Sequence, residues 1–400
     1  LLPKPAPTTP GIMAEAKLQQ DRPTDAAAAG KALCPVLPEH LVFNSQLGKG
    51  AYGEVFLCDN QKDGSQVAVK TIRDFARDPL FGKRILREIR ILAVLEHPNL
   101  LKLVDLLPGS QGAGHDINDV YIVMPYMHLD LHKVIYKTKT ALSEAHRQAF
   151  SCQILRGLKY LHSAGVVHRD LKPSNILVNK DCTLRIADLG LARGRTSHDE
   201  ELTDYVVTRW YRAPELMLLP SGYFEAVDLW SVGCIHVELM KRKPLFPGEN
   251  HVDMLRRIAG VLGFSRGRDL AWVPKTHYAD ALNFVDTLGL VESGPEDSLG
   301  SKLGAEASEM CLEFVRELLT FDPTKRISAA QALAHRYLVH LSDPAGETVA
   351  NEQFGWDFDH FEATKKALQE RVFDECARRH PELCTPTPPK AAAAPAAAPL

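Results

Sequence analysis

The sequence has few of the features that mark secreted, membrane or nucleic-acid-binding proteins. Its 400 residues include eight scattered cysteines, without a CxxC pair or a histidine spacing of the zinc type, which argues against a disulfide scaffold. No apolar run approaches the roughly 18 residues that span a bilayer, and the C-terminus is not a prenylation box. A net charge of −3 gives no electrostatic reason to expect nucleic acid or an anionic membrane as a partner. We therefore expect a soluble protein of a reducing, intracellular compartment that binds neither nucleic acid nor membrane.

The chain changes in character along its length. Residues 1–38 and 385–400 are rich in proline and alanine and have few side chains that could form a core, which predicts disordered tails. Residues 41–124 contain short β-type runs, at 55–58, 67–72 and 120–124, and one helix predicted at 81–96. After Pro125 helical periodicity predominates, with helices expected from an N-cap at Ser143 to Gly165 and at 227–241, 251–262, 308–319 and 328–337. The pattern predicts an α+β fold, with a small β-rich lobe at 41–124, a hinge near 124–127 and a larger helical lobe at 128–338.

The most informative segment is VVHRDLKPSNILV, residues 166–178, followed by DLG at 188–190. In the spacing HRDxxxxN, Asp170 can accept the proton of an incoming hydroxyl group, while Asn175 offers a carbonyl oxygen to a magnesium ion. Asp188 supplies a second hard oxygen ligand, and Lys172 can reach a phosphoryl group in transfer. These spacings predict a phosphotransferase whose metal ligands are Asn175 and Asp188.

A glycine-rich segment, GKGAYGEV, lies between two predicted strands. Its glycines, Gly48, Gly50 and Gly53, let backbone N–H groups approach phosphate oxygens, although a simple hairpin turn would also use them. Lys70 lies on the next apolar run, where a half-buried ammonium group needs an anion. Glu88, on the predicted helix, can hold Lys70 against the phosphates of a nucleotide, with a surface ion pair as the alternative.

These elements occur in the order typical of eukaryotic protein kinases, which the sequence resembles over residues 41–338. The ordered motifs are GKGAYGEV, VAVK, Glu88, HRDLKPSN, DLG, APE at 213–215, DLWSVG at 228–233 and Arg326. The resemblance implies the bilobal kinase fold, with ATP and Mg²⁺ bound in the cleft. It also implies further nucleotide-binding positions, which are Leu47, Lys49, Ala51, Tyr52, Val55, Ala68, Met124, Met127 and Leu177.

Residues 203–216, TDYVVTRWYRAPEL, are similar to the activation segment of mitogen-activated protein (MAP) kinases, which carry a Thr-x-Tyr pair. Here the pair is Thr203 and Tyr205. The resemblance implies a monomer in the cytoplasm and nucleus that an upstream dual-specificity MAP kinase kinase activates and phosphatases reset, with Ser/Thr-Pro protein substrates. Each phosphate adds about −1.5 to −2 of charge, which positioned arginines can receive. The implied receivers are Arg87, Arg169 and Arg193 for Thr203, and Arg209 and Arg212 for Tyr205.

Residues 339–384 resemble the C-terminal extension of this family, which implies a docking motif and a helix packed on the kinase domain. The motif SDPAGET retains Asp343 and Glu347 but has Gly346 where a second aspartate usually stands. We expect weaker, salt-sensitive docking of basic peptides in consequence. DLG has leucine where most relatives have phenylalanine, and because leucine is also apolar we expect activity to survive. A helix with its buried stripe at 368, 372 and 376 is predicted to pack against the body of the protein.

Two alternative functions stay open. One is a kinase of the cyclin-dependent type, which needs a regulatory subunit, and the other is a non-catalytic scaffold with a kinase fold. Tyr205 and the C-terminal extension favour the MAP kinase interpretation over the first. An intact catalytic set argues against the second: Lys70, Glu88, Asp170, Lys172, Asn175 and Asp188.

Overall fold

The computed structural model describes residues 37–50, 53–109, 116–139, 141–194, 208–219, 225–290 and 298–384. The predicted tails therefore lie outside the described residues, apart from positions 37 and 38. The chain divides into two compact units. The sheet unit comprises the described residues of 23–90, 103–125 and 361–400, and the helical unit those of 91–102 and 126–360. The predicted hinge at 124–127 contains the boundary between Pro125 and Tyr126.

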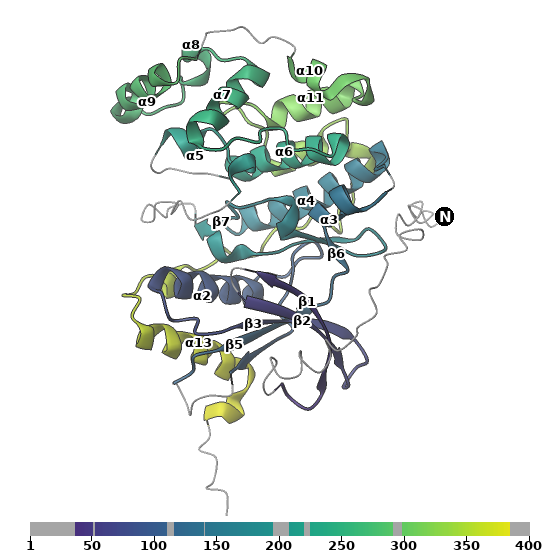
Figure 1. The fold of residues 1–400 in the computed structure, drawn as a ribbon, viewed down its shortest axis with the longest axis vertical. Coiled ribbons are helices and arrows are strands. Elements are labelled where there is room, and N and C mark those ends of the chain that lie inside the picture. Colours follow the sequence, from purple (N-terminus) through teal and green to yellow (C-terminus); the bar gives the residue numbers. More distant parts are fainter. Residues whose placement is uncertain are drawn as a thin grey trace, which may run out of the picture. The chain divides into compact units, whose positions relative to one another are not determined.

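The sheet unit is built on an antiparallel sheet with the strand order β1-β2-β3-β5-β4 (Figure 1). The β-type runs expected from the sequence all lie within its strands. The strand bounds are β1 (Leu41–Gly50), β2 (Gly53–Asn60), β3 (Gln66–Ile72), β4 (Asp105–Pro108) and β5 (Val120–Pro125).

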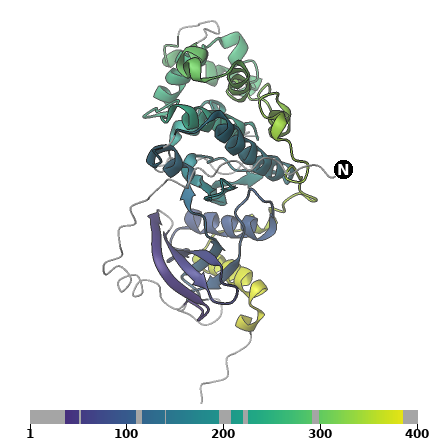
Figure 2. The same cartoon turned by 90° about the vertical axis from the view of Figure 1, so that its right-hand side faces the viewer.

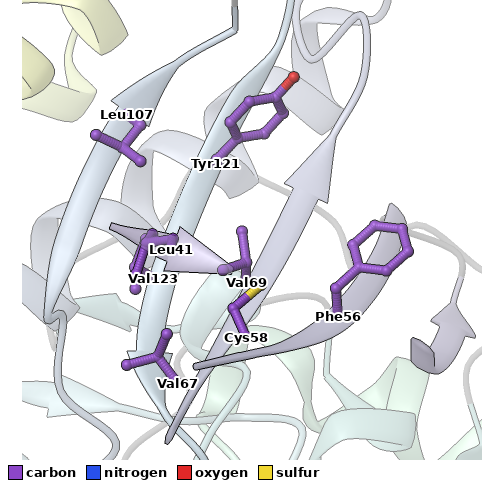
Figure 3. Close-up of a cluster of buried hydrophobic side chains, with 8 residues drawn as sticks. All are labelled: Leu41, Phe56, Cys58, Val67, Val69, Leu107, Tyr121 and Val123. Atoms are coloured by element: carbon purple, nitrogen blue, oxygen red, sulfur yellow. The ribbon is translucent and has the colours of Figure 1, made fainter. Parts of the chain in front are cut away.

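The two faces of this sheet carry different sets of side chains, since successive residues of a strand point to opposite sides. One face carries a buried hydrophobic cluster, shown in Figure 3, that consists of Leu41, Phe56, Cys58, Val67, Val69, Leu107, Tyr121 and Val123. Positions that alternate with the cluster on β2, β3 and β5 share the other face. Among them, Val55 pairs with Lys70, and Ala68 pairs with Met124. Four of the predicted nucleotide-binding residues are thus neighbours on one face.

Two helices of the sheet unit, α2 (Pro79–Val94, as far as Arg90) and α13 (Lys365–Arg379), lie side by side. Figure 2 shows the curved strands with α13 beside them. α2 begins earlier than predicted because the Asp78 side chain accepts a hydrogen bond from the N–H of Phe81 at 2.8 Å. Proline is tolerated in such a first turn since its missing N–H would have no helical partner. The predicted stripe at 368, 372 and 376 of α13 is fully buried.

The helical unit contains most of the helices. Their bounds are α3 (Leu131–Lys137), α4 (Glu144–Ser163), α5 (Glu215–Leu218), α6 (Ala226–Lys241), α7 (His251–Leu262), α8 (Arg266–Asp269), α9 (Lys275–Thr287), α10 (Ser298–Leu303), α11 (Glu309–Leu318) and α12 (Ala329–Ala334). Its short strands form the sheets β6-β8-β9 and β10-β7, with bounds β6 (Leu129–Asp130), β7 (Val166–Val167), β8 (Ile176–Val178), β9 (Leu184–Ile186) and β10 (Arg193–Gly194). Short 3₁₀ turns include η1 (Pro173–Asn175), η2 (Leu189–Leu191) and η3 (Arg209–Tyr211).

Of the helices of this unit, α4, α6, α7 and α11 were predicted close to their observed bounds, α12 was predicted too long, and α3, α5, α8, α9 and α10 were not predicted. Ser143 caps α4 by accepting a hydrogen bond from the N–H of His146, and the chain leaves the helix through Gly165 at φ +73°. The helix expected at 328–337 is α12, which already ends at Ala334. A turn after it brings Tyr337 into the core, where only 1% of its surface is exposed, so tertiary packing overrides the helical pattern. In the described part of the chain, no helix has both the length and the apolarity needed to cross a bilayer.

Candidate active site

A buried aspartate organises the segment that carries the predicted base. Asp228, fully buried on α6, accepts hydrogen bonds from the backbone N–H groups of Arg169 at 2.8 Å and of His168 at 2.9 Å. His162 Nε2 on α4 lies 2.8 Å from the same carboxylate. Burial alone would raise the pKa of Asp228, but the hydrogen bond with His162 and the nearby histidines hold it below its ordinary value. Residues 166–175, here called the catalytic loop, are thereby fixed to two helices.

Asp170, Lys172 and Asn175 meet within this catalytic loop. Lys172 Nζ lies 2.6 Å from Asp170 Oδ2. The Asn175 amide donates to the backbone oxygen of Asp170 at 2.9 Å and to its carboxylate at 3.2 Å. Burial raises the pKa of Asp170, while the charge of Lys172 opposes the shift and that of Asp188 adds to it. Because the nitrogen of the Asn175 amide is engaged, its carbonyl oxygen is the atom that can face a cation.

The DLG segment is tied to the catalytic loop through backbone contacts. The Ala187 N–H donates to the backbone oxygen of Asn175 at 2.8 Å, and His168 Nε2 lies 3.0 Å from the backbone oxygen of Ala187. Asp188 follows in the left-handed region, at φ +60°. An amide oxygen and a carboxylate suit a hard cation that takes its other ligands from water and phosphate. The described residues contain no group of three or more His, Cys, Asp and Glu side chains that would complete a metal site without such outside ligands.

The glycine-rich segment forms the turn between β1 and β2, where Gly50 is paired with Gly53. Gly53 has φ +142°, and a Cβ atom there would lie 2.0 Å from the backbone oxygen of Thr71, so this position requires glycine. Among the other predicted residues of the segment, Ala51 and Tyr52 lie outside the described residues. Leu47, Gly48 and Lys49 lie on the exposed end of β1.

Lys70 and Glu88 form an ion pair between β3 and α2. Lys70 Nζ lies 2.7 Å from both carboxylate oxygens of Glu88. The side chains are only 13% and 5% exposed, so the pair is not the exposed surface contact that was the alternative. A cation held in this way at the face shared with Val55 and Ala68 can receive a phosphate group.

The other predicted residues are distributed over both units. Met127 is buried, and Leu177 is half-buried on β8. Arg87, on α2, is buried in the sheet unit. In the helical unit Arg193 pairs with Val167, which brings it near the catalytic loop, while Arg209 begins η3 and Arg212 directly follows it. Thr203 and Tyr205, the predicted phosphorylation sites, lie outside the described residues.

Sequence analysis missed the buried side chains that hold the catalytic loop and the APE segment in place. Asp228 and Arg326 occur in motifs noted above, but no contact was assigned to them. Arg326 forms a fully buried two-point ion pair with Glu215 of APE, at 2.6 and 2.9 Å. Glu238, on α6, accepts hydrogen bonds from Tyr136 and Tyr211, both at 2.7 Å. The available signal was the presence of acidic residues inside the otherwise apolar segment 226–241, since buried charges need partners.

The docking residues lie beside α4 in the helical unit. Asp343 Oδ2 is 4.0 Å from Arg156 Nη1, and Glu347 Oε2 is 3.5 Å from Lys159 Nζ. Between them, the backbone oxygen of Gly346 contacts His97 Nε2 at 3.1 Å. The two acidic side chains retained from the predicted motif therefore already face basic partners of the chain.

This set of residues, on a β-sheet unit followed by a helical unit, is that of a protein kinase. Residues 41–338 match the family model of the protein kinase domain. The predicted fold class and the predicted enzyme class, a protein serine/threonine kinase that uses ATP, are confirmed.

Curated relatives narrow the family. Mitogen-activated protein kinase 3 of Arabidopsis thaliana is 42% identical over 335 residues, covering 84% of this chain and 88% of that protein. Mitogen-activated protein kinase 1 of Oryza sativa subsp. japonica is 42% identical over 348 residues, covering 87% and 82%. Mitogen-activated protein kinase 6 of Arabidopsis thaliana is 42% identical over 336 residues, covering 84% and 82%. The chain belongs to the mitogen-activated protein kinases.

Proposed function

We propose that this MAP kinase transfers the γ-phosphate of ATP, with Mg²⁺, to serine or threonine followed by proline, and that phosphorylation of Thr203 and Tyr205 activates it. The observation that carries the proposal is the joint placement of Asp170, Lys172 and Asn175 in one hydrogen-bonded loop. A base, a cation and an oxygen ligand within such reach are what phosphoryl transfer requires, because catalysis there depends mainly on positioning and charge stabilisation.

Each side chain has a separate task in this proposal. Asp170 orients the substrate hydroxyl group and accepts its proton, which burial favours by raising the pKa of the carboxyl group. Lys172, adjacent to that carboxylate, stabilises the charge of the phosphoryl group. Lys70, fixed by Glu88, binds phosphates of the nucleotide. Asn175 and Asp188 would hold Mg²⁺, which supplies neutralisation of phosphate charge when bound.

The proposed switch depends on arginines on both sides of the phosphorylation sites along the chain. Arg193 precedes Thr203 and Tyr205 in the sequence, and Arg209 and Arg212 follow them, so each new phosphate has candidate cations before and after it. The proline requirement is supported by the similarity of TDYVVTRWYRAPEL to the activation segments of the family. Proline lacks a backbone N–H and therefore needs no partner for one in a shallow pocket.

One experiment tests the switch and the specificity together. The protein is incubated with an active MAP kinase kinase and ATP, and mass spectrometry locates phosphate within residues 195–212. We expect both Thr203 and Tyr205 to be modified, and a Ser-Pro peptide to be phosphorylated far faster than its Ser-Ala counterpart. Equal rates on the two peptides would reject proline direction, and full activity of the Thr203→Ala/Tyr205→Phe variant would reject the switch.

A second measurement isolates catalysis from regulation. The variants Asp170→Asn and Asp188→Asn should each lose at least about 100-fold in kcat, because they remove a base or a metal ligand from an otherwise unchanged loop. Asp253→Asn, at a half-buried position of α7, is the control for the same chemical change. Near-normal turnover of Asp188→Asn would contradict the metal assignment.

We also propose that upstream kinases, substrates and phosphatases dock weakly at Asp343 and Glu347. Both carboxylates face basic side chains of α4, so a basic peptide must compete with Arg156 and Lys159. A side chain at position 346 would start 2.9 Å from Asp343 Oδ2 and 3.5 Å from Arg156 Nη1. Gly346→Asp should therefore tighten the binding of an arginine-rich docking peptide at low salt, as measured by fluorescence anisotropy. No gain in affinity would argue against this surface as the docking site.

A further inference from the structure

Helix α13 connects the helix that carries Glu88 with the sheet that carries Lys70. All three elements belong to the sheet unit. The Lys70–Glu88 ion pair spans from β3 to α2, so its geometry depends on where α2 lies against the sheet. Contacts that hold α2 in place therefore also hold the catalytic ion pair.

Two contacts join α13 to α2, one on each side of Glu88 along the helix. At Gly82 the helices touch so closely that a Cβ atom would lie 2.5 Å from Leu368 Cδ1 and 3.2 Å from its Cγ. Arg90 Nη1 forms an ion pair with Glu375 Oε1 at 2.9 Å. With a rise of 1.5 Å per residue, these contacts lie about 12 Å apart along the helix axis. α13 thus supports the whole stretch of α2 that surrounds the catalytic glutamate.

Other contacts join α13 and the turn after it to the sheet. His380 Nε2 lies 2.7 Å from Asp105 Oδ1 on the edge strand β4. Gln369 Nε2 donates to the backbone oxygen of Ile117, just before β5, at 2.9 Å. Both β4 and β5 belong to the same sheet as β3, and β5 is hydrogen-bonded directly to it. α13 is therefore a brace between the sheet and α2.

We propose that α13 is a built-in positioning element for Glu88, and that Gly82, Leu368, Arg90 and Glu375 are its positioning residues. They act through Glu88 and not on the substrate. Glycine at position 82 permits the close approach, the buried leucine fills the contact, and the ion pair prevents α2 from sliding or rotating. The inference rests on the ATP-dependent kinase activity of the family and is independent of proline specificity and of Thr203 and Tyr205.

Gly82→Ala gives the sharpest test because alanine ordinarily stabilises a helix interior. Here its methyl group would meet Leu368, and since Cγ is also close, rotation of the terminal methyl groups cannot make room. We expect kcat/KM for ATP to fall about tenfold, because a shift of Glu88 would misplace Lys70 relative to the nucleotide. We also expect a fluorescent ATP analogue to bind more weakly and the amides of α13 to exchange faster with deuterium.

Matched variants separate positioning from a general loss of stability. Gly82→Ala/Leu368→Ala removes the colliding atoms and should recover most of the loss in kcat/KM. Glu375→Gln keeps the shape of the side chain but removes the charge that faces Arg90, and should lower kcat/KM about threefold with an unchanged fold. Gly260→Ala, in α7, is the control, since no atom lies within 4 Å of a Cβ atom there.

The outcomes decide between the positioning role and its absence. Faster exchange in α13 of Gly82→Ala with unchanged ATP binding and unchanged kcat/KM would overturn the proposal, because α13 would then move without effect on Glu88. Unchanged exchange and unchanged kinetics would overturn it as well, since the contact would not be tight. Loss of activity without recovery in the double variant would also contradict it. ATP-analogue binding needs no protein substrate, so these results stay separate from a failure of the proposed proline specificity.

Discussion

Replacing Asp228 by asparagine should loosen the catalytic loop while preserving the size of the side chain. In the native protein the carboxylate accepts two backbone N–H groups and faces His162, all at 2.8 to 2.9 Å. The oxygen of asparagine can take the place of Oδ2, which faces both His162 and the N–H of His168, and its amino group then takes the place of Oδ1. The N–H of Arg169 would therefore face another donor and lose its acceptor.

The number of hydrogen bonds lost sets the expected change in the free energy of unfolding. An unsatisfied buried donor costs about 1–3 kcal/mol, and a hydrogen bond to a charged acceptor is worth about 1.5–3 kcal/mol. We therefore expect Asp228→Asn to lower the free energy of unfolding by about 2–3 kcal/mol. The unpaired N–H belongs to the segment beside Asp170, so the loop should shift, and a displacement of about 1 Å can cost roughly 100-fold in rate.

Urea unfolding and steady-state kinetics, both well below the unfolding temperature of the variant, measure these two effects. Asp253→Asn provides the comparison, because Asp253 is half-buried in the first turn of α7, away from the catalytic loop. It pairs with Arg257 one turn away, a contact worth no more than about 0.5 kcal/mol, and accepts a hydrogen bond from the N–H of Glu249 that asparagine can keep. An Asp228→Asn protein with wild-type stability and kcat within twofold of the wild type would refute the reasoning.

The same aspartate makes a pH prediction. Its folded-state pKa is below the ordinary value of 3.8, so the stability that it contributes is present above that value and is lost as the pH falls through the lower, folded-state pKa. Wild-type and Asp228→Asn proteins should therefore converge in stability at acidic pH and differ most near neutrality. A difference that is constant between pH 3 and pH 7 would contradict the assignment.

Three further substitutions test the supports of the site. Arg326→Met should cost about 3–5 kcal/mol in chemical unfolding, since it leaves Glu215 as a buried, uncompensated charge, and an unchanged midpoint would contradict this. Gly53→Ala should lower thermal stability and weaken ATP-analogue binding, because its Cβ atom would collide with Thr71; equal binding would disprove the steric argument. Lys70→Met should abolish most turnover with ATP, and kinetics within tenfold of the wild type would remove its phosphate-binding role.

The sequence by itself determined which residues can take part in the reaction and which kinds of secondary structure contain them. HRDLKPSN and DLG place a base, a lysine and two oxygen donors at short separations, so local spacing nearly defines their geometry. Strand and helix signals at β2, β3, α4 and α6 were equally local, since they depend on alternation, periodicity and caps such as Ser143. These features can be predicted from the sequence because the interacting residues are close neighbours along the chain.

The tertiary structure alone decided which distant side chains support that chemistry. Three contacts join segments that are far apart in the chain: Asp228 with the catalytic loop, Arg326 with Glu215 of APE, and Glu375 with Arg90. A residue's type shows that a buried charge needs a partner, but not which partner, because the choice depends on how elements pack. For the same reason the early end of α12 could not be predicted: Tyr337 gains more from burial in the core than from another helical turn.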